Sequence, residues 1–264
     1  MNLGLTTELA AAYSSGLQRA RVLTEPWVES QVYCPNCGHD TLTRHPNNSE
    51  IGDFHCQACS ENYELKSKRT RFGAKVDDGA YQAMRRRLSG SANPSLFLLN
   101  YDLTYVAVTD FAVIPKHFIT LDMVEKKNAL GPTARRKGWV GCRIRIQAVP
   151  EAGRIVMVRN GFVQPKLAVR DQWRRCLFLL GQRDLGKRRW LVHIMRCIDR
   201  VGKDAFSLDE VYAFEDELRA AYPCNRHIKA KIRQQLQVLR ENRYLEFVGS
   251  GSYKLCRSMG STGR

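Results

Sequence analysis

The sequence predicts an α/β protein in which a mixed sheet flanked by helices is followed by a winged helix-turn-helix domain. Two patterns predict this fold: short β-rich runs alternate with helical stretches up to about residue 182, and amphipathic helices followed by a β-hairpin occupy the remainder. The 264 residues also exceed the roughly 100 to 150 that are typical of one domain. We therefore expect two domains, residues 1–182 and 183–264, divided within the polar, glycine-containing run GQRDLGKRRW.

Charge and cysteine content restrict the partners and the environment of the chain. There are 42 Lys and Arg residues and 26 Asp and Glu residues, giving a net charge of +16, and both halves are basic. Such an excess is typical of proteins that bind a phosphate-rich partner, so nucleic acid is the first candidate. The absence of a signal-like segment and of a run of about 18 apolar residues predicts a cytoplasmic protein without a membrane span. Nine cysteines, four of them in Cys-x-x-Cys units, favour metal binding in a reducing compartment over disulfides.

The elements of the first domain follow from local patterns. Apolar residues at helical spacing predict a helix over residues 5–21 that ends before Pro26, because proline disfavours helix at the residue before it. The alternating segment NYELKSK predicts a strand. Residues 77–88 predict a helix with two acids in its first turn, in accord with the helix dipole. Further strands are expected at residues 95–102, 105–110, 111–116 and 153–158. Another strand is expected after a Gly- and Arg-rich loop that begins at residue 131, and a helix over residues 166–180 closes the domain.

The second domain reads as helices followed by a hairpin. A first helix carries the apolar face Trp190, Leu191, Ile194, Met195 and Ile198. Ser207 and Glu210 predict a capping box that opens a second helix through Tyr222, and Asn225 predicts the cap of a third. The runs YLEFV and YKL around GSGS predict a two-stranded wing.

Two Cys-x-x-Cys units predict a metal site. Cys34 and Cys37 are separated from Cys56 and Cys59 by eighteen residues, which is within the spacing of four-thiolate zinc sites. Each unit can form a tight knuckle that directs two sulfurs at one ion, and four thiolates leave no open position, so we expect a structural Zn²⁺. The alternative is a set of buried cysteines or a redox pair. Histidines nearby are not needed as ligands.

An acidic and basic trio lies in and beside the loop that these cysteines would close. Ten residues separate Asp53 from Glu64-Leu65-Lys66, and strand alternation puts Glu64 and Lys66 on one face of a sheet. The carboxylates of Asp53 and Glu64 and the carbonyl of Leu65 are suitable oxygen ligands for Mg²⁺, and the lysine can position or activate a water for phosphodiester hydrolysis. The alternative is a solvated charged strand edge. Gly52 stands where a proline usually precedes the aspartate.

The third helix of the second domain predicts a DNA-reading surface. Its outward face carries side chains suited to base edges in the major groove: Ala230, Arg233, Gln234 and Gln237. Lys229 and Lys231 flank this face and would meet phosphates. The alternative is that this face is simply solvated. Gln235 lies nearer the buried side of the helix, so we expect it to be structural.

The order of several segments resembles a known family. They are RVLTEPW, YCPNCG, DFHCQAC, YELKSK, DDGAY, LGPTARRKGWVGC and NRHIKAKIRQQLQVLR. The chain is similar nearly end to end to the DpnI-like type IIM restriction endonucleases, which cut GATC only when its adenine is N6-methylated. The resemblance implies a PD-(D/E)xK nuclease domain with a zinc knuckle inserted at about residues 33–60, followed by a winged helix that also binds methylated DNA.

Carried over residue by residue, the resemblance implies that Asp53, Glu64 and Lys66 are catalytic and that the four cysteines bind zinc. Trp139 matches the tryptophan of the family's GW-GC loop and is a candidate group for contacting methyladenine or inserting into DNA, whereas a lone tryptophan before a strand is more often part of a core. Arg135 and Arg136 beside it would make this loop face DNA.

The function that the resemblance implies is Mg²⁺-dependent cleavage of double-stranded DNA at adenine-methylated GATC by a type II site-specific deoxyribonuclease, expected to be monomeric, with both domains on DNA. The alternative is a zinc-containing winged-helix regulator whose acidic trio is incidental. An RNA-binding ribbon protein is a third reading, and the winged helix disfavours it because a helix fits the major groove of B-form DNA better than that of RNA.

Overall fold

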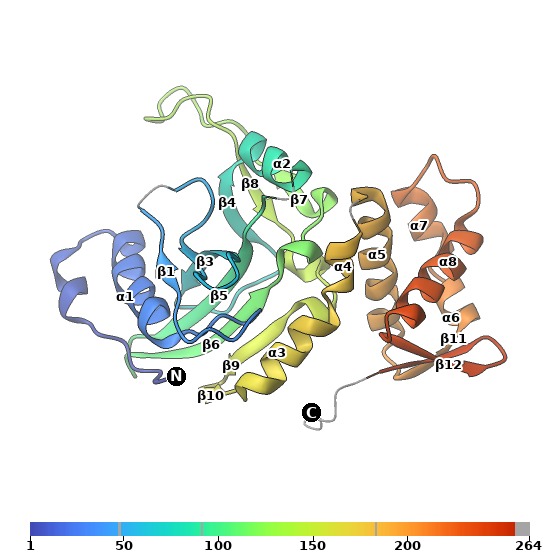
Figure 1. The fold of residues 1–264 in the computed structure, drawn as a ribbon. Coiled ribbons are helices and arrows are strands. Elements are labelled where there is room, and N and C mark those ends of the chain that lie inside the picture. Colours follow the sequence, from blue (N-terminus) through green and yellow to red (C-terminus); the bar gives the residue numbers. More distant parts are fainter. Residues whose placement is uncertain (47–48, 91, 183, 257–264) are drawn as a thin grey trace. The chain divides into compact units, whose positions relative to one another are not determined.

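The computed structural model of the protein describes residues 1–46, 49–90, 92–182 and 184–256 (Figure 1). The chain forms two compact units, Met1–Arg174 and Arg175–Arg264. This division precedes the boundary that the sequence predicts between residues 182 and 183, and that boundary stays a prediction. No helix in the described part of the chain is long and apolar enough to cross a membrane.

A seven-stranded sheet with the order β1-β2-β3-β5-β6-β9-β10 forms the centre of the first unit. Strands β3 and β5 are parallel and the other neighbours are antiparallel, so the predicted mixed sheet is confirmed. The two strands predicted at 105–110 and 111–116 are one continuous strand, β6, which ends before Pro115. The strands are β1 (Thr43–Arg44), β2 (Phe54–His55), β3 (Asn62–Lys68), β5 (Ser95–Asp102), β6 (Ala107–Ile114), β9 (Ile155–Arg159) and β10 (Phe162–Val163).

One face of this sheet holds the aromatic core. Tyr63 stacks on Phe97 with ring centroids 4.4 Å apart, and Phe97 lies 5.0 Å from Phe111. Trp27 of helix α1 (Gly16–Gln31) packs edge-on against Phe111, and Trp173 of helix α3 (Lys166–Arg175) lies 6.4 Å from Tyr63. Because side chains alternate along β3, Glu64 and Lys66 project from the opposite face.

The first helix differs from its prediction. A short 3₁₀ helix, η1 (Glu8–Ala12), precedes α1, and Pro26 lies inside α1 instead of ending it. A proline within a helix costs about 3 kcal/mol because it removes one backbone hydrogen bond. The next two residues, Trp27 and Val28, are 4 % and 0 % exposed, and burying such side chains contributes about 1.5–3 kcal/mol each. Burial of this turn therefore outweighs the proline.

A second sheet of the first unit has the order β4-β8-β7, with β4 (Val76–Ala80), β7 (Val124–Lys126) and β8 (Gly141–Ile144). The helix predicted over residues 77–88 is wrong at its start, because Asp77 and Asp78 lie in β4 and helix α2 covers Tyr81–Ser89. Asp78 pairs with Cys142 of β8, a partner more than sixty residues away that no local pattern reveals. The closing helix is likewise divided, into α3 and α4 (Phe178–Gly181). Short 3₁₀ helices complete the unit: η2 (Lys116–Phe118), η3 (Leu121–Met123), η4 (Ile146–Ala148) and η5 (Glu151–Gly153).

The second unit confirms the predicted winged helix. It contains α4, and its further helices are α5 (Leu185–Val201), α6 (Leu208–Tyr212), α7 (Glu215–Ala221) and α8 (Ile228–Glu241). Its sheet has the order β11-β13-β12, with β11 (Ala205–Ser207), β12 (Leu245–Gly249) and β13 (Ser252–Leu255). The capping box of Ser207 and Glu210 is formed. The helix predicted through Tyr222 is interrupted between α6 and α7. The predicted cap, Asn225, instead accepts a hydrogen bond from the backbone N–H of His227, and α8 begins one residue later.

Candidate functional site

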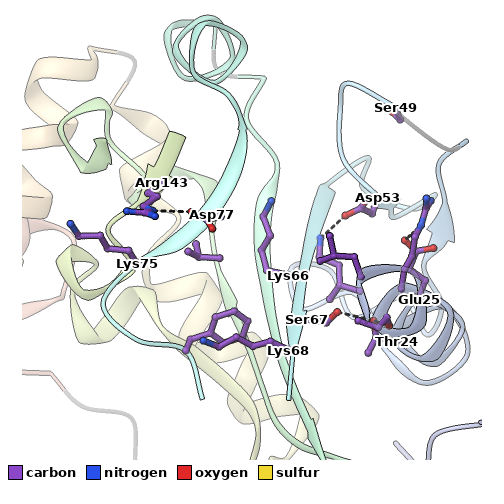
Figure 2. A pocket seen from close by; sticks show the side chains of 16 residues that line it. Thr24, Glu25, Ser49, Asp53, Lys66, Ser67, Lys68, Lys75, Asp77 and Arg143 are labelled. Carbon is purple, nitrogen blue, oxygen red and sulfur yellow. Dashed lines mark hydrogen bonds and ion pairs between the residues drawn. The ribbon is translucent and has the colours of Figure 1, made fainter. Parts of the chain in front are cut away.

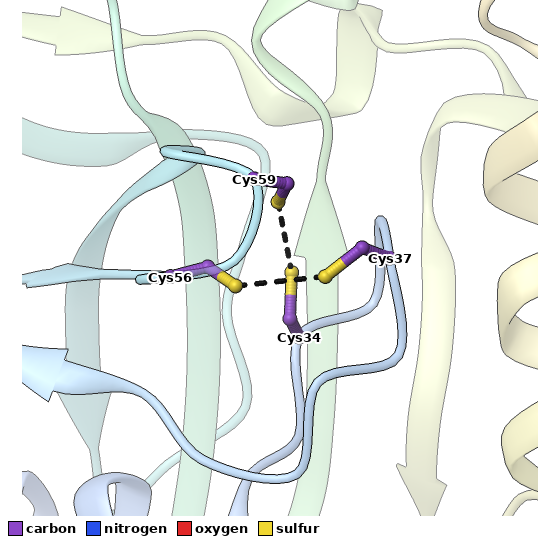
Figure 3. A group of neighbouring side chains, drawn as sticks. All are labelled: Cys34, Cys37, Cys56 and Cys59. Carbon is purple, nitrogen blue, oxygen red and sulfur yellow. Dashed lines mark hydrogen bonds between the residues drawn. The ribbon is translucent and has the colours of Figure 1, made fainter.

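The four cysteines of the two knuckles converge on one point (Figure 3). Their sulfurs all lie within 4.8 Å of one another, and within the described residues this ligand group contains no histidine. The Sγ atoms of Cys34 and Cys59 are 3.6 Å apart and those of Cys37 and Cys56 are 3.5 Å apart. Tetrahedral zinc with Zn–S bonds of about 2.3 Å requires S···S distances of roughly 3.8 Å. The cluster therefore fits a zinc ion.

The backbone of both knuckles is built in the same way. The residue after the second cysteine has a positive φ in each, +86° at Gly38 and +57° at Ser60. Its N–H donates to the carbonyl of the first cysteine at 2.8 Å in both knuckles. The side-chain amide of Asn36 donates to Cys59 Sγ at 3.4 Å, and the hydroxyl of Tyr63 lies 3.1 Å from Cys34 Sγ. Donors directed at the sulfurs are the surroundings expected of metal-bound thiolates.

The second knuckle leads directly back to Asp53. Strand β2 occupies the two residues between Asp53 and Cys56, and it pairs with the start of β3, Phe54 opposite Tyr63. The Asp53 backbone N–H donates to the Tyr63 carbonyl at 2.8 Å. The metal frame and the strand pairing together therefore hold Asp53 against β3.

Gly52 explains why the proline of the usual pattern is absent. Its φ is +127°, which proline cannot adopt because its ring holds φ near −65°. A Cβ atom at this position would lie 2.8 Å from the Tyr63 carbonyl oxygen. The chain thus needs glycine here to bring Asp53 close to β3.

The structure brings Asp53 to the edge of β3 that β2 leaves open. Its Oδ2 accepts a hydrogen bond of 2.7 Å from the Leu65 N–H (Figure 2). The N–H and C=O of one strand residue point to the same edge, so the Leu65 carbonyl faces the same side as Asp53. On the neighbouring face, Lys66 Nζ lies 2.6 Å from Glu64 Oε1. The predicted trio and Leu65 are therefore neighbours, and their catalytic roles stay predictions.

Two further charged residues join this group, and the sequence interpretation missed them. Asp78 of β4 lies with Oδ1 3.0 Å from Lys66 Nζ, and its side chain is 1 % exposed. Arg87 of α2 reaches Glu64 Oε2 at 3.4 Å and Asp78 Oδ2 at 3.8 Å. The sequence predicts Asp78 to be an acidic residue in the first turn of a helix. The run Val76-Asp77-Asp78 does not alternate apolar and polar residues, so no local pattern marks it as a strand.

Burial and ion pairing act against each other in this cluster. Burial raises the pKa of the Glu64 carboxyl, with Lys66 opposing and Asp78 reinforcing the rise. Burial works to lower the pKa of Lys66, but the carboxylates of Glu64 and Asp78 outweigh it and raise that pKa above its ordinary value. At Asp78 burial works to raise the pKa, but Lys66 outweighs it, so the carboxyl has a lowered pKa. The lysine is therefore held as a cation beside two carboxyl groups.

Asp53, Leu65 and Lys66 line a cleft of about 810 Å³ between α1, β3 and β4 (Figure 2). Its lining contains five basic side chains, Arg21, Lys66, Lys68, Lys75 and Arg143, and three acidic ones, Glu25, Asp53 and Asp77. An excess of positive charge beside a carboxylate such as that of Asp53 suits a phosphate backbone together with a metal ion.

Trp139 lies near the end of the long loop between β7 and β8, which extends away from the sheet at the top of Figure 1. Its side chain is half-buried, so it is neither a core residue nor fully exposed. The ring covers Gly141, where a Cβ would lie 2.7 Å from it, and the Arg136 guanidinium lies 4.6 Å from its centroid. Arg135 and Arg136 are exposed. A contact of this loop with DNA stays a prediction.

Helix α8 has the two faces that the sequence predicts. Its buried face consists of Ile228, Ile232, Gln235, Leu236 and Leu239. The residues expected to meet bases are all exposed, namely Ala230, Arg233, Gln234 and Gln237. Arg233 donates to the Tyr212 hydroxyl at 3.0 Å, and Lys231 donates to Gln234 at 2.7 Å. Lys229 is exposed and Lys231 half-buried at the edge of this face. Contact of this face with DNA stays a prediction.

Comparison with protein families covers nearly the whole chain. Residues 1–182 match the DpnI family, described as the Dam-replacing family. Residues 186–255 match the DpnI C-terminal domain, described as the Dam-replacing HTH domain. These matches support a restriction endonuclease that binds DNA. The chain belongs to the DpnI, Dam-replacing family.

Proposed function

We propose that the protein is a type II site-specific deoxyribonuclease that hydrolyses double-stranded DNA at GATC sites containing N6-methyladenine, with Mg²⁺ as cofactor. The observation that carries the proposal is the arrangement of Asp53 at the open edge of β3 beside the Glu64–Lys66 pair in a basic cleft. A regulator that only binds DNA has no need for two buried or half-buried carboxylates on one lysine with a third carboxylate, that of Asp53, held at the adjacent strand residue.

The residues divide the work as follows. Asp53, Glu64 and the Leu65 carbonyl supply the oxygen ligands that Mg²⁺ prefers. When bound, the ion supplies charge neutralisation and an activated water for attack on the phosphate. Lys66 is held as a cation and stabilises the charge that develops on the phosphate oxygens. The zinc frame keeps Asp53 in place, as the connection through β2 supports.

Recognition is proposed to involve both units. In the first unit, Trp139, Arg135 and Arg136 present an aromatic ring and two positive charges on the β7–β8 loop. In the second unit, the exposed face of α8 offers Arg233 for guanine and Gln234 and Gln237 for adenine. The family supports a methyl-directed enzyme, and we propose that it acts as a monomer in the cytoplasm.

Plasmid from an adenine-methylating host and plasmid from a non-methylating host test this function directly. With Mg²⁺, the full-length protein is expected to cut the methylated plasmid into discrete fragments and to leave the other intact. The Asp53→Ala variant should bind the methylated DNA without cutting it. Intact methylated plasmid over a range of divalent ions would favour the alternative, a zinc-containing winged-helix regulator.

A further inference from the structure

The proposed metal ligand Glu64 is fully engaged by cations in this structure. Oε1 of its carboxylate lies 2.6 Å from Lys66 Nζ, and Oε2 lies 3.4 Å from Arg87 Nη1. Each carboxylate oxygen keeps a further lone pair, but a divalent ion bound there would lie beside Lys66 and Arg87, and repulsion between like charges favours the release of at least one of these cations. The released cation then needs another partner, because an unpaired charge beside a second cation is costly in a partly buried site.

Asp78 is the second partner of both cations. Its Oδ1 lies 3.0 Å from Lys66 Nζ, and its Oδ2 lies 3.8 Å from Arg87 Nη2. Among the described residues, Oδ2 accepts no hydrogen bond although it is buried. This oxygen is therefore the acceptor toward which Arg87 can move when it leaves Glu64.

The position of Asp78 is built by an irregularity in β4. The pairing of β4 with β8 shifts register between Asp78 and Ala80, which is a β-bulge. The Gly79 N–H within it donates to Asp78 Oδ1 at 2.7 Å. Bulges of this kind turn a side chain away from its regular direction and occur beside active sites. Here the bulge holds a carboxylate of the second sheet against Lys66 of the first sheet.

We propose that Asp78 is a positioning residue that accepts Lys66 and Arg87 when Glu64 turns to a divalent ion. This inference rests on the proposed function and adds to it a charge exchange between two carboxylates. Asp78 touches neither DNA nor metal in this role. It keeps Lys66 and Arg87 in place beside a metal site. The negative charges of Asp53, Glu64 and Asp78 balance the positive charges of these two cations.

The test uses the zinc-loaded, full-length protein and Asp78→Asn, which keeps the size of the side chain and removes its charge. In the variant both cations stay on Glu64, so the Mg²⁺ concentration for half-maximal cleavage should rise about 10- to 100-fold. Calorimetric titration with Mg²⁺ alone should show the same loss without any reference to activity. Affinity for methylated GATC duplex in buffer without added Mg²⁺ or chelator should be unchanged.

Two further variants separate this role from a loss of folding. Glu61→Gln removes a comparably buried carboxylate, paired with Lys116 at 2.8 Å and with Ser95 at 2.7 Å, outside the cluster. It should lower the melting temperature and leave Mg²⁺ affinity at the wild-type value. Adding Arg87→Gln to Asp78→Asn frees Glu64 Oε2 and restores neutrality, so it should recover part of the Mg²⁺ affinity.

Wild-type Mg²⁺ affinity in Asp78→Asn would overturn the inference, and so would a double variant that binds Mg²⁺ no better than Asp78→Asn. Failure of the wild-type protein to cut methylated plasmid is a different result, because it refutes the proposed function. The calorimetric comparison of the variants still decides the charge exchange in that case.

Discussion

Replacement of Gly52 by alanine tests whether the approach of Asp53 to β3 sets the rate of cleavage. Alanine at φ +127° strains the backbone, and strain of this kind costs about 1–3 kcal/mol. The added Cβ would lie 2.8 Å from the Tyr63 carbonyl oxygen, whereas ordinary contacts begin at 3.4 Å, so the segment has to shift by about 0.6 Å. The shift weakens the hydrogen bond from the Asp53 N–H to Tyr63 and displaces the carboxylate from Leu65.

The expected result is a loss in both stability and rate. The melting temperature should fall by roughly 2–4 °C for each kcal/mol of strain. Because a misplacement of about 1 Å can cost 10²-fold in rate, single-turnover cleavage of a methylated GATC duplex should fall about 10- to 100-fold. Differential scanning calorimetry and quenched-flow cleavage at saturating Mg²⁺ measure the two effects.

Gly161→Ala is the matched control. Gly161 also has a positive φ, +78°, but a Cβ there meets no atom within 4 Å. This variant should lose stability through strain alone and cut at the wild-type rate. The reasoning is refuted if Gly52→Ala cuts as fast as the wild type, or if both variants lose the same fraction of their rate.

Three other substitutions test the cysteine frame, the exposed face of α8 and the stability of the protein at low pH. Cys56→Ser should lower cleavage because the segment through β2 no longer holds Asp53, and added zinc should not replace Mg²⁺; wild-type cleavage would show that frame and site are merely neighbours. Arg233→Ala should weaken binding to the methylated site by about 1–3 kcal/mol relative to an altered site, as measured by fluorescence anisotropy, and equal losses on both would argue against base reading. Lys203 and the Ser207 N–H lower the pKa of Glu210 from its ordinary 4.5, so the capping box stabilises the protein above that pH and loses this contribution as the pH falls through the lower folded value. Glu210→Gln should therefore flatten the pH dependence of the melting temperature below pH 4.5, and an unchanged slope would exclude this contribution.

Much of the site follows from short-range patterns. The spacing of the cysteines depends only on the local geometry of each knuckle, and the four sulfurs converge as the spacing predicts. The alternation of β3 puts Glu64 and Lys66 on one face because side chains along a strand repeat every two residues. The capping box at Ser207 and the buried face of α8 also follow from patterns within a few turns of chain. Such features are predictable because the residues that make them are close in sequence.

Other features depended on partners far away in the sequence. Asp78 reads as a helix residue until β4 pairs with β8, and only then does its carboxylate meet Lys66. Pro26 ends a helix by local preference, but burial of the following turn against β6 keeps the helix intact.

Gly52 departs from the expected proline because the backbone of Tyr63 approaches it. The sequence by itself therefore determined the metal frame, the shared face of Glu64 and Lys66 and the buried and exposed faces of α8. Tertiary structure alone decided which further charges surround that pair, since pairing between distant strands and the burial of particular turns leave no periodic signal in the chain.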